Sequence, residues 1–154
     1  MPSPRPPYRY DVVGSFLRPE KLKDARARFA EGLIDKKELT DVENEAIKEL
    51  VEQEKAAGLF AVTDGEFRRS MWHLDFLTEL KGCREVGAEH WSVEFKGHQP
   101  QSKTVVIDGQ IGFGEHPFLD HFAYTASVAG DTTVKQTIPS PSMLHLICCV
   151  REEN

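Results

Sequence analysis

The sequence predicts an α/β fold built on short parallel strands, and three observations lead to this interpretation. Phe60–Thr63 is a short apolar run, typical of a strand covered on both faces, and it leads into Asp64-Gly65. Segments of helical periodicity precede and follow it. An earlier β-type run completes a strand–helix–strand order, which favours a right-handed parallel crossover. In such folds ligands bind in the loops after the carboxyl ends of strands.

Length and composition indicate one globular domain of 154 residues, too short for a complete (β/α)8 barrel of roughly 200–250 residues. The net charge is -6 and no basic block exceeds two residues, which argues against nucleic-acid binding. No apolar run is long enough to span a membrane. Three cysteines do not form a disulfide framework, so we expect a reducing, cytoplasmic location. Residues 1–9 are predicted to be a proline-rich arm.

The first predicted strand, Tyr10–Phe16, is interrupted by Gly14-Ser15. Glycine lets the backbone approach a ligand closely, and Ser15 adds an N–H and a hydroxyl group. A plain strand-to-helix turn is the alternative interpretation. A helix is then expected from Arg18-Pro19 to Gly32, because Leu22, Ala25 and Phe29 share one face.

A second helix is predicted to begin at the capping box Thr40–Glu43 and to stop at Gly58. After the strand Phe60–Thr63, aromatic residues four apart predict a helix over Arg69–Lys81 that ends at Gly82. Between Trp91 and Phe113 the hydrophobic period changes to two, which indicates an inserted β-hairpin.

The last predicted elements are a helix over Pro117–Ala129, stopped by Gly130, and a third strand over Val134–Ile138. This strand leads into the loop Pro139–Ser142. Residues 146–154 finish the chain.

Three loops should therefore lie at equivalent ends of three parallel strands. Backbone N–H groups around Gly14 and Ser15 could hold a carboxylate, and Glu66 could hold an ammonium group, which together suit an amino acid. The alternative for Glu66 is a salt bridge to Arg68 or Arg69. The six histidines are scattered and there is no HExxH or CxxC motif, so no metal ligand is assigned.

Three motifs in register resemble the cobalamin-independent methionine synthase family, in particular its short, single-barrel members. They are Val12–Pro19 (VVGSFLRP), Thr63–Arg69 (TDGEFRR) with Trp72–Phe76 (WHLDF), and Thr137–His145 (TIPSPSMLH). The resemblance extends over residues 10–145 and implies roughly the first three βα units of a (β/α)8 barrel, followed by a divergent tail over 146–154.

The family transfers a methyl group from a methylated folate to the thiol of homocysteine, which a zinc ion holds as a thiolate. By resemblance, the backbone of Val13, Gly14 and Ser15 would bind the homocysteine carboxylate, and Glu66 its amino group. The family's zinc ligands and proton-donating histidine match no position of this chain, and no folate contact is assigned in Gly97–Gln101.

The resemblance leaves three interpretations open. The chain is a truncated or frame-shifted part of a methionine synthase-like barrel, inactive alone, that self-associates through uncovered sheet edges. Alternatively, it is a non-catalytic interaction module that uses those edges. A third interpretation is a methyltransferase that acts on another thiol.

Overall fold

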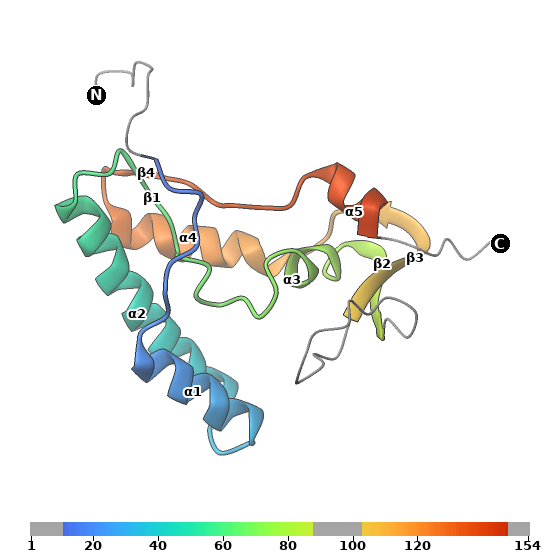
Figure 1. Ribbon diagram of the computed structural model, residues 1–154, viewed down its shortest axis with the longest axis horizontal. Coiled ribbons are helices and arrows are strands. Elements are labelled where there is room, and N and C mark those ends of the chain that lie inside the picture. The colour runs from blue at the N-terminus through green and yellow to red at the C-terminus, as the bar shows by residue number, and fades with distance from the viewer. Residues whose placement is uncertain (1–10, 88–102, 148–154) are drawn as a thin grey trace, which may run out of the picture. The chain divides into compact units, whose positions relative to one another are not determined.

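The computed structural model describes residues 11–87 and 103–147 and shows a mixed α/β protein (Figure 1). The predicted proline-rich arm and most of the predicted tail lie outside these residues. The described residues fold as two compact units, one formed by residues 11–69 and 119–137 and the other by residues 70–87, 103–118 and 138–147. The elements are α1 (Glu20–Ala30), α2 (Lys36–Ala56), β1 (Ala61–Val62), α3 (Leu74–Leu77), β2 (Lys81–Gly87), β3 (Lys103–Gly112), α4 (Pro117–Ala129), β4 (Thr133–Val134) and α5 (Pro141–Ile147).

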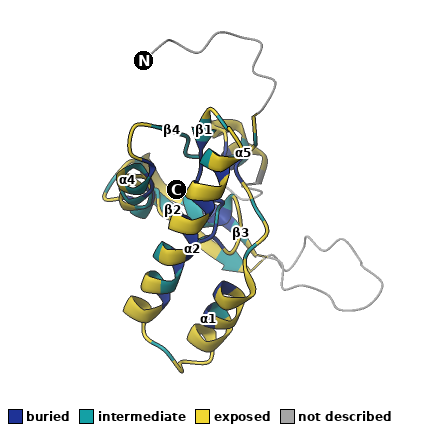
Figure 2. Ribbon diagram, turned by 90° about the vertical axis from the view of Figure 1, so that its left-hand side faces the viewer, coloured by how far each residue is buried: buried dark blue, intermediate teal, exposed yellow. Residues whose placement is uncertain are grey.

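In the first unit, α1 and α2 form a helical hairpin whose apolar faces pack together (Figure 1). Figure 2 shows the buried positions on one side of α2, as an amphipathic helix requires. The core combines these faces with β1, the loop after it and the end of α4. Its buried members are Leu22, Ala46, Ile47, Leu50, Val51, Val62, Phe67 and Ala129.

The helix α2 begins earlier than the sequence predicted. Asp35 is the N-cap: its side chain accepts the Glu38 N–H, and the Glu38 carboxylate accepts the Asp35 N–H. This box takes the place of the predicted one at Thr40–Glu43, which lies inside the helix. Glu43 is instead buried, where it pairs with Arg26 and Arg68.

Strands β1 and β4 pair in parallel, with Ala61 opposite Thr133 and Val62 opposite Val134. The predicted parallel orientation of these two segments is therefore confirmed, over shorter strands. The first predicted strand, Tyr10–Phe16, is wrong over residues 11–16, which carry no strand pairing. Gly14, at φ 148°, bends this segment, and the Lys135 side chain binds the carboxylate of Asp11 and the carbonyl of Val12 in place of a ladder partner.

In the second unit, β2 and β3 form an antiparallel hairpin with Arg84 opposite Val106. The second strand of the predicted hairpin is present as β3, but it pairs with Lys81–Gly87; the predicted first strand near Ser92–Lys96 lies outside the described residues. Leu74, Leu77 and Val105 pack with Leu144 of α5 in a second core.

The helix predicted over Arg69–Lys81 is reduced to the single turn α3. The Asp75 carboxylate accepts the N–H groups of Ser70 and Met71, and this holds the preceding residues in a loop. Gly82 belongs to β2 and does not end a helix.

The predicted helix Pro117–Ala129 is confirmed as α4, and Gly130 follows it at φ 64°. The helix α5 begins at Pro141, within the segment Pro139–Ser142 that the sequence predicted to be a loop. Among the helices of residues 11–87 and 103–147, none combines the length and the apolar character needed to cross a membrane.

Candidate functional site

The loop after β1 is shaped by its own side chains. The Asp64 carboxylate accepts the Glu66 N–H at 3.0 Å, and the Thr63 hydroxyl accepts the Gly65 N–H at 3.1 Å. Gly65 and Glu66 both have positive φ, at 64° and 57°. A glutamate rarely adopts this conformation, and strained residues of this kind cluster at binding sites and catalytic sites. The loop therefore presents Glu66 at the carboxyl end of a buried strand.

The Gly14 loop lies directly against this strand end. The buried Thr63 hydroxyl donates to the Gly14 carbonyl at 3.0 Å, and the Phe16 N–H donates to the Gly65 carbonyl at 3.1 Å. Gly14 is itself buried, and a Cβ at this position would lie 2.5 Å from Cγ2 of Thr137. Only glycine fits this contact, because φ 148° also disfavours any side chain.

Arg18 fixes the other side of the same loop. One terminal nitrogen of its guanidinium donates to the carbonyl oxygens of Glu66 and Arg69, at 2.8 and 2.5 Å. The backbone of Glu66 is thus held at its N–H by Asp64 and at its carbonyl by Arg18. These bonds stabilise a turn whose conformation is costly for a residue with a side chain.

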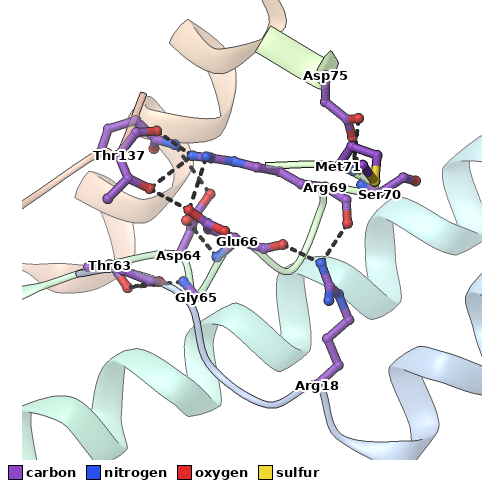
Figure 3. Close-up of polar contacts among 12 residues, drawn as sticks. Arg18, Thr63, Asp64, Gly65, Glu66, Arg69, Ser70, Met71, Asp75 and Thr137 are labelled. Atoms are coloured by element: carbon purple, nitrogen blue, oxygen red, sulfur yellow. Dashed lines mark hydrogen bonds and ion pairs between the residues drawn. The ribbon is translucent and has the colours of Figure 1, made fainter. Parts of the chain in front are cut away.

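The Glu66 carboxylate is held in place by two neighbours (Figure 3). Its Oε1 accepts from Nη1 of Arg69 at 3.1 Å and from the Thr137 hydroxyl at 2.9 Å. Arg69 also donates to the carbonyl and hydroxyl oxygens of Thr137. The side chains of Glu66 and Arg69 are 13% and 3% exposed, so this is a largely buried pair.

A second buried carboxylate, that of Glu54, accepts a hydrogen bond from the backbone at the end of β1. Glu54 of α2 accepts the Thr63 N–H with both of its oxygens, at 3.2 and 3.0 Å. Burial raises the pKa of Glu54 above its usual range, while the hydrogen bonds from Thr63 oppose that rise. Glu54 therefore satisfies a backbone donor at the edge of β1, directly before the Asp64–Phe67 loop.

The structure brings Gly14 and Glu66, two of the four residues singled out in the sequence, into one loop cluster. Val13 and Ser15 flank Gly14 and are exposed; the Val13 side chain is 87% exposed. The alternative of a salt bridge from Glu66 is present too, and its partner is Arg69; Arg68 pairs instead with Glu43.

Sequence reasoning assigned no role to Arg18 or Thr137, although both belong to the quoted motifs VVGSFLRP and TIPSPSMLH. Their contacts with Glu66 join residues 48 and 71 positions apart, a distance at which local patterns carry no signal.

Within residues 11–87 and 103–147, no group of three or more histidine, cysteine or acidic side chains is arranged to hold a metal ion. Cys83 lies on the hairpin, where burial raises the pKa of its thiol and so disfavours the thiolate that binds metals. The described donor set therefore does not fit a zinc site.

Comparison with known families gives one match over nearly the whole chain. Residues 10–153 match the family described as cobalamin-independent synthase, catalytic domain. Among curated proteins, the uncharacterised protein YxjG of Bacillus subtilis (strain 168) is 44% identical over 91% of this chain. A methionine synthase of Sulfolobus acidocaldarius is 28% identical over 84% of it.

Solved structures give the same relationship. The chain resembles the crystal structure of a Listeria monocytogenes protein assigned as a vitamin-B12 independent methionine synthase, with a TM-score of 0.72 and 44% identity over 88% of this chain. The chain spans 37% of that structure's chain and 37% of both curated proteins.

Proposed function

Since the chain belongs to the family of cobalamin-independent synthase catalytic domains, we propose that its loop cluster binds the amino-acid substrate of a methionine synthase-like reaction. The backbone of Val13, Gly14 and Ser15 receives the carboxylate of homocysteine or methionine, and Glu66 receives the ammonium group. The observation that carries the proposal is that Glu66, in a strained conformation, shares a hydrogen-bonded loop cluster with Gly14.

Charge and exposure support this assignment. Ser15 is exposed beside the buried Gly14, which places this residue at the surface of the cluster. Within the described part of the chain, Glu66 binds Arg69 and Thr137 through Oε1. Its other carboxylate oxygen, Oε2, is the one that we propose for the ligand. A carboxylate that is already oriented binds an ammonium group at a lower entropic cost.

We propose further that β1 and β4 are neighbouring strands of a (β/α)8 barrel, with residues 10–145 as its N-terminal part. Their parallel pairing supports this, since the loops after parallel strands converge on one face of a barrel. The loop Asp64–Phe67 and the segment that contains Thr137 both follow such strands and are in contact.

In the family, a zinc ion holds the thiol of homocysteine as a thiolate, and a methylated folate supplies the methyl group. The described residues do not fit a zinc site. Our proposal for these 154 residues by themselves is binding of the amino-acid end of the substrate without methyl transfer. A second candidate function is methyl transfer to a thiol other than homocysteine.

Isothermal titration of the purified chain with methionine and homocysteine tests the proposal. Weak binding that does not require zinc, and that Glu66→Ala abolishes, is the expected result. Absence of binding in a chain shown to be folded by circular dichroism would contradict it. Tight binding that requires added zinc would contradict the assignment of no metal ligand.

A different class of function, a non-catalytic interaction module, is favoured by one observation. Leu17 and Val13 are 97% and 87% exposed, beside a parallel strand pair that has no further partner strand among the described residues. Such edges and apolar side chains promote association, and we propose that a second copy of this chain covers them.

A further inference from the structure

Thr137 contacts both parts of the loop cluster. Its methyl carbon packs against Gly14, where a Cβ would come within 2.5 Å, and its hydroxyl donates to Oε1 of Glu66 at 2.9 Å. The same hydroxyl accepts from Nη2 of Arg69 at 3.2 Å. One small side chain thus contacts the loop proposed for the carboxylate and the residue proposed for the ammonium group.

The polar bonds also orient the Glu66 carboxylate. Both donors, Arg69 Nη1 and the Thr137 hydroxyl, bind Oε1, so the carboxylate cannot rotate without breaking two bonds (Figure 3). Because Arg69 also donates to the carbonyl oxygen of Thr137, the three residues form a closed network. Thr137 is fixed in this network at its backbone as well as at its side chain.

We infer that Thr137 is a positioning residue that sets the separation between the carboxylate-binding loop and Glu66, and so selects ligands that carry both a carboxylate and an α-ammonium group. The inference rests on the proposed function of this cluster. It adds a residue that touches neither ligand group in that proposal and acts through Gly14 and Glu66.

Two substitutions separate the two contacts of Thr137. Thr137→Val keeps a branched side chain against Gly14 and removes the hydroxyl, whereas Thr137→Ser keeps the hydroxyl and removes the methyl group. Thr133→Val is the matched control, because it makes the same change at an exposed residue of β4. Valine is favoured in strands, so this substitution should not disturb the fold.

Binding of methionine and of its desamino analogue, methylthiobutanoate, is then measured by titration. Thr137→Val should weaken methionine binding about 5- to 10-fold, as expected for the net contribution of one lost hydrogen bond, and leave methylthiobutanoate binding unchanged. Thr137→Ser should retain the preference for methionine, and Thr133→Val should bind both ligands as the wild type does. Equal losses for both ligands in Thr137→Val, or no loss at all, would overturn the inference.

A measurement without ligand keeps the inference separate from the proposed function. In a double-mutant cycle of Thr137→Val and Glu66→Ala, urea unfolding should show a coupling of about 3- to 10-fold in the unfolding equilibrium constant. Absence of coupling would overturn the positioning role even if methionine binds. If the wild type binds neither ligand, the proposed function fails and the ligand selection with it, while the cycle still decides whether Thr137 positions Glu66.

Discussion

The Thr63 hydroxyl donates a hydrogen bond to the Gly14 carbonyl oxygen at 3.0 Å, and it joins two segments that are 49 residues apart in the sequence. Thr63 is buried, so this bond is shielded from water. The Phe16 N–H adds a second bond across the same junction, to the Gly65 carbonyl. The geometry of the candidate site therefore depends on how closely the Gly14 backbone can approach the end of β1.

Gly14→Ala should destabilise the chain by about 2–4 kcal/mol, because its Cβ meets Thr137 in a conformation that side chains rarely adopt. Gly32→Ala is the control: Gly32 also has positive φ, at 72°, but a Cβ there meets nothing within 4 Å. Urea denaturation measures both. Equal costs for the two variants would show that backbone strain alone matters and that the contact with Thr137 does not.

Glu43→Ala should cost about 3–5 kcal/mol, because it leaves the Arg68 guanidinium buried without its carboxylate. The side chains of Glu43 and Arg68 are only 2% and 6% exposed. The surface pair Lys21–Glu45 provides a comparison, and Lys21→Ala should change the free energy of unfolding by less than about 1 kcal/mol. A loss of similar size in both variants, measured by urea denaturation, would contradict the role given to the buried pair.

Glu54 should make folding more favourable in acid than at neutral pH. Burial raises its pKa in the folded state above the usual 4.5, so the folded state holds a proton that the unfolded state releases. Its stabilising contribution is complete below pH 4.5 and is lost as pH rises through the raised value. Comparing the free energy of unfolding of wild type and Glu54→Gln across this range tests the sign. The difference should change with pH; a difference independent of pH would exclude the shift.

His121 should act in the opposite direction. Burial, with the nearby Arg68 charge, lowers the pKa of His121 from 6.5 to about 4, so the folded state favours the neutral ring. Its contribution to stability is present above pH 6.5 and is lost as pH falls toward 4. In His121→Gln the stability difference from wild type should shrink over this interval. Histidine NMR titration of the wild type measures the pKa directly, and a value near 6.5 would contradict the prediction.

Self-association should depend on Leu17. Sedimentation equilibrium of the wild type should show dimers or larger species, and Leu17→Glu should shift them toward monomer by placing a charge on a side chain that is 97% exposed. Leu33→Glu is the control, because Leu33 is also exposed but lies in the turn between α1 and α2. A wild type that is monomeric over a wide concentration range would contradict the proposal of a second copy.

Local signals predicted the elements whose boundaries are set by backbone chemistry. Pro117 and Gly130 fix α4, and Gly58 ends the segment of α2, as the sequence indicated. The sequence contains two possible capping boxes five residues apart, and the prediction placed the start of α2 at the second one. In the structure the first box caps the helix, because Glu43 of the second box forms ion pairs with Arg26 and Arg68. Arg69–Lys81 has helical spacing, but the Asp75 carboxylate binds N–H groups before the turn.

The candidate site was only partly predictable for a related reason. Gly14 and Glu66 follow β-type runs, and residue type alone suggests their chemistry. The bonds that place them come from Arg18 and Thr137, far away in the sequence. The partner of Glu66 was likewise left open between two arginines, and the choice of Arg69 depends on the turn that brings it within 3.1 Å.

The proposed function requires that the Gly14 loop and Glu66 together bind an amino acid. The most direct measurement is a two-dimensional amide NMR titration of the folded chain with methionine. Shifts should be concentrated at Gly14, Ser15, Gly65 and Glu66, should be absent in Glu66→Ala, and should leave the β2–β3 hairpin unchanged. Shifts confined to other segments, or no shifts at methionine concentrations of about 10 mM, where even millimolar affinity would be visible, would contradict it.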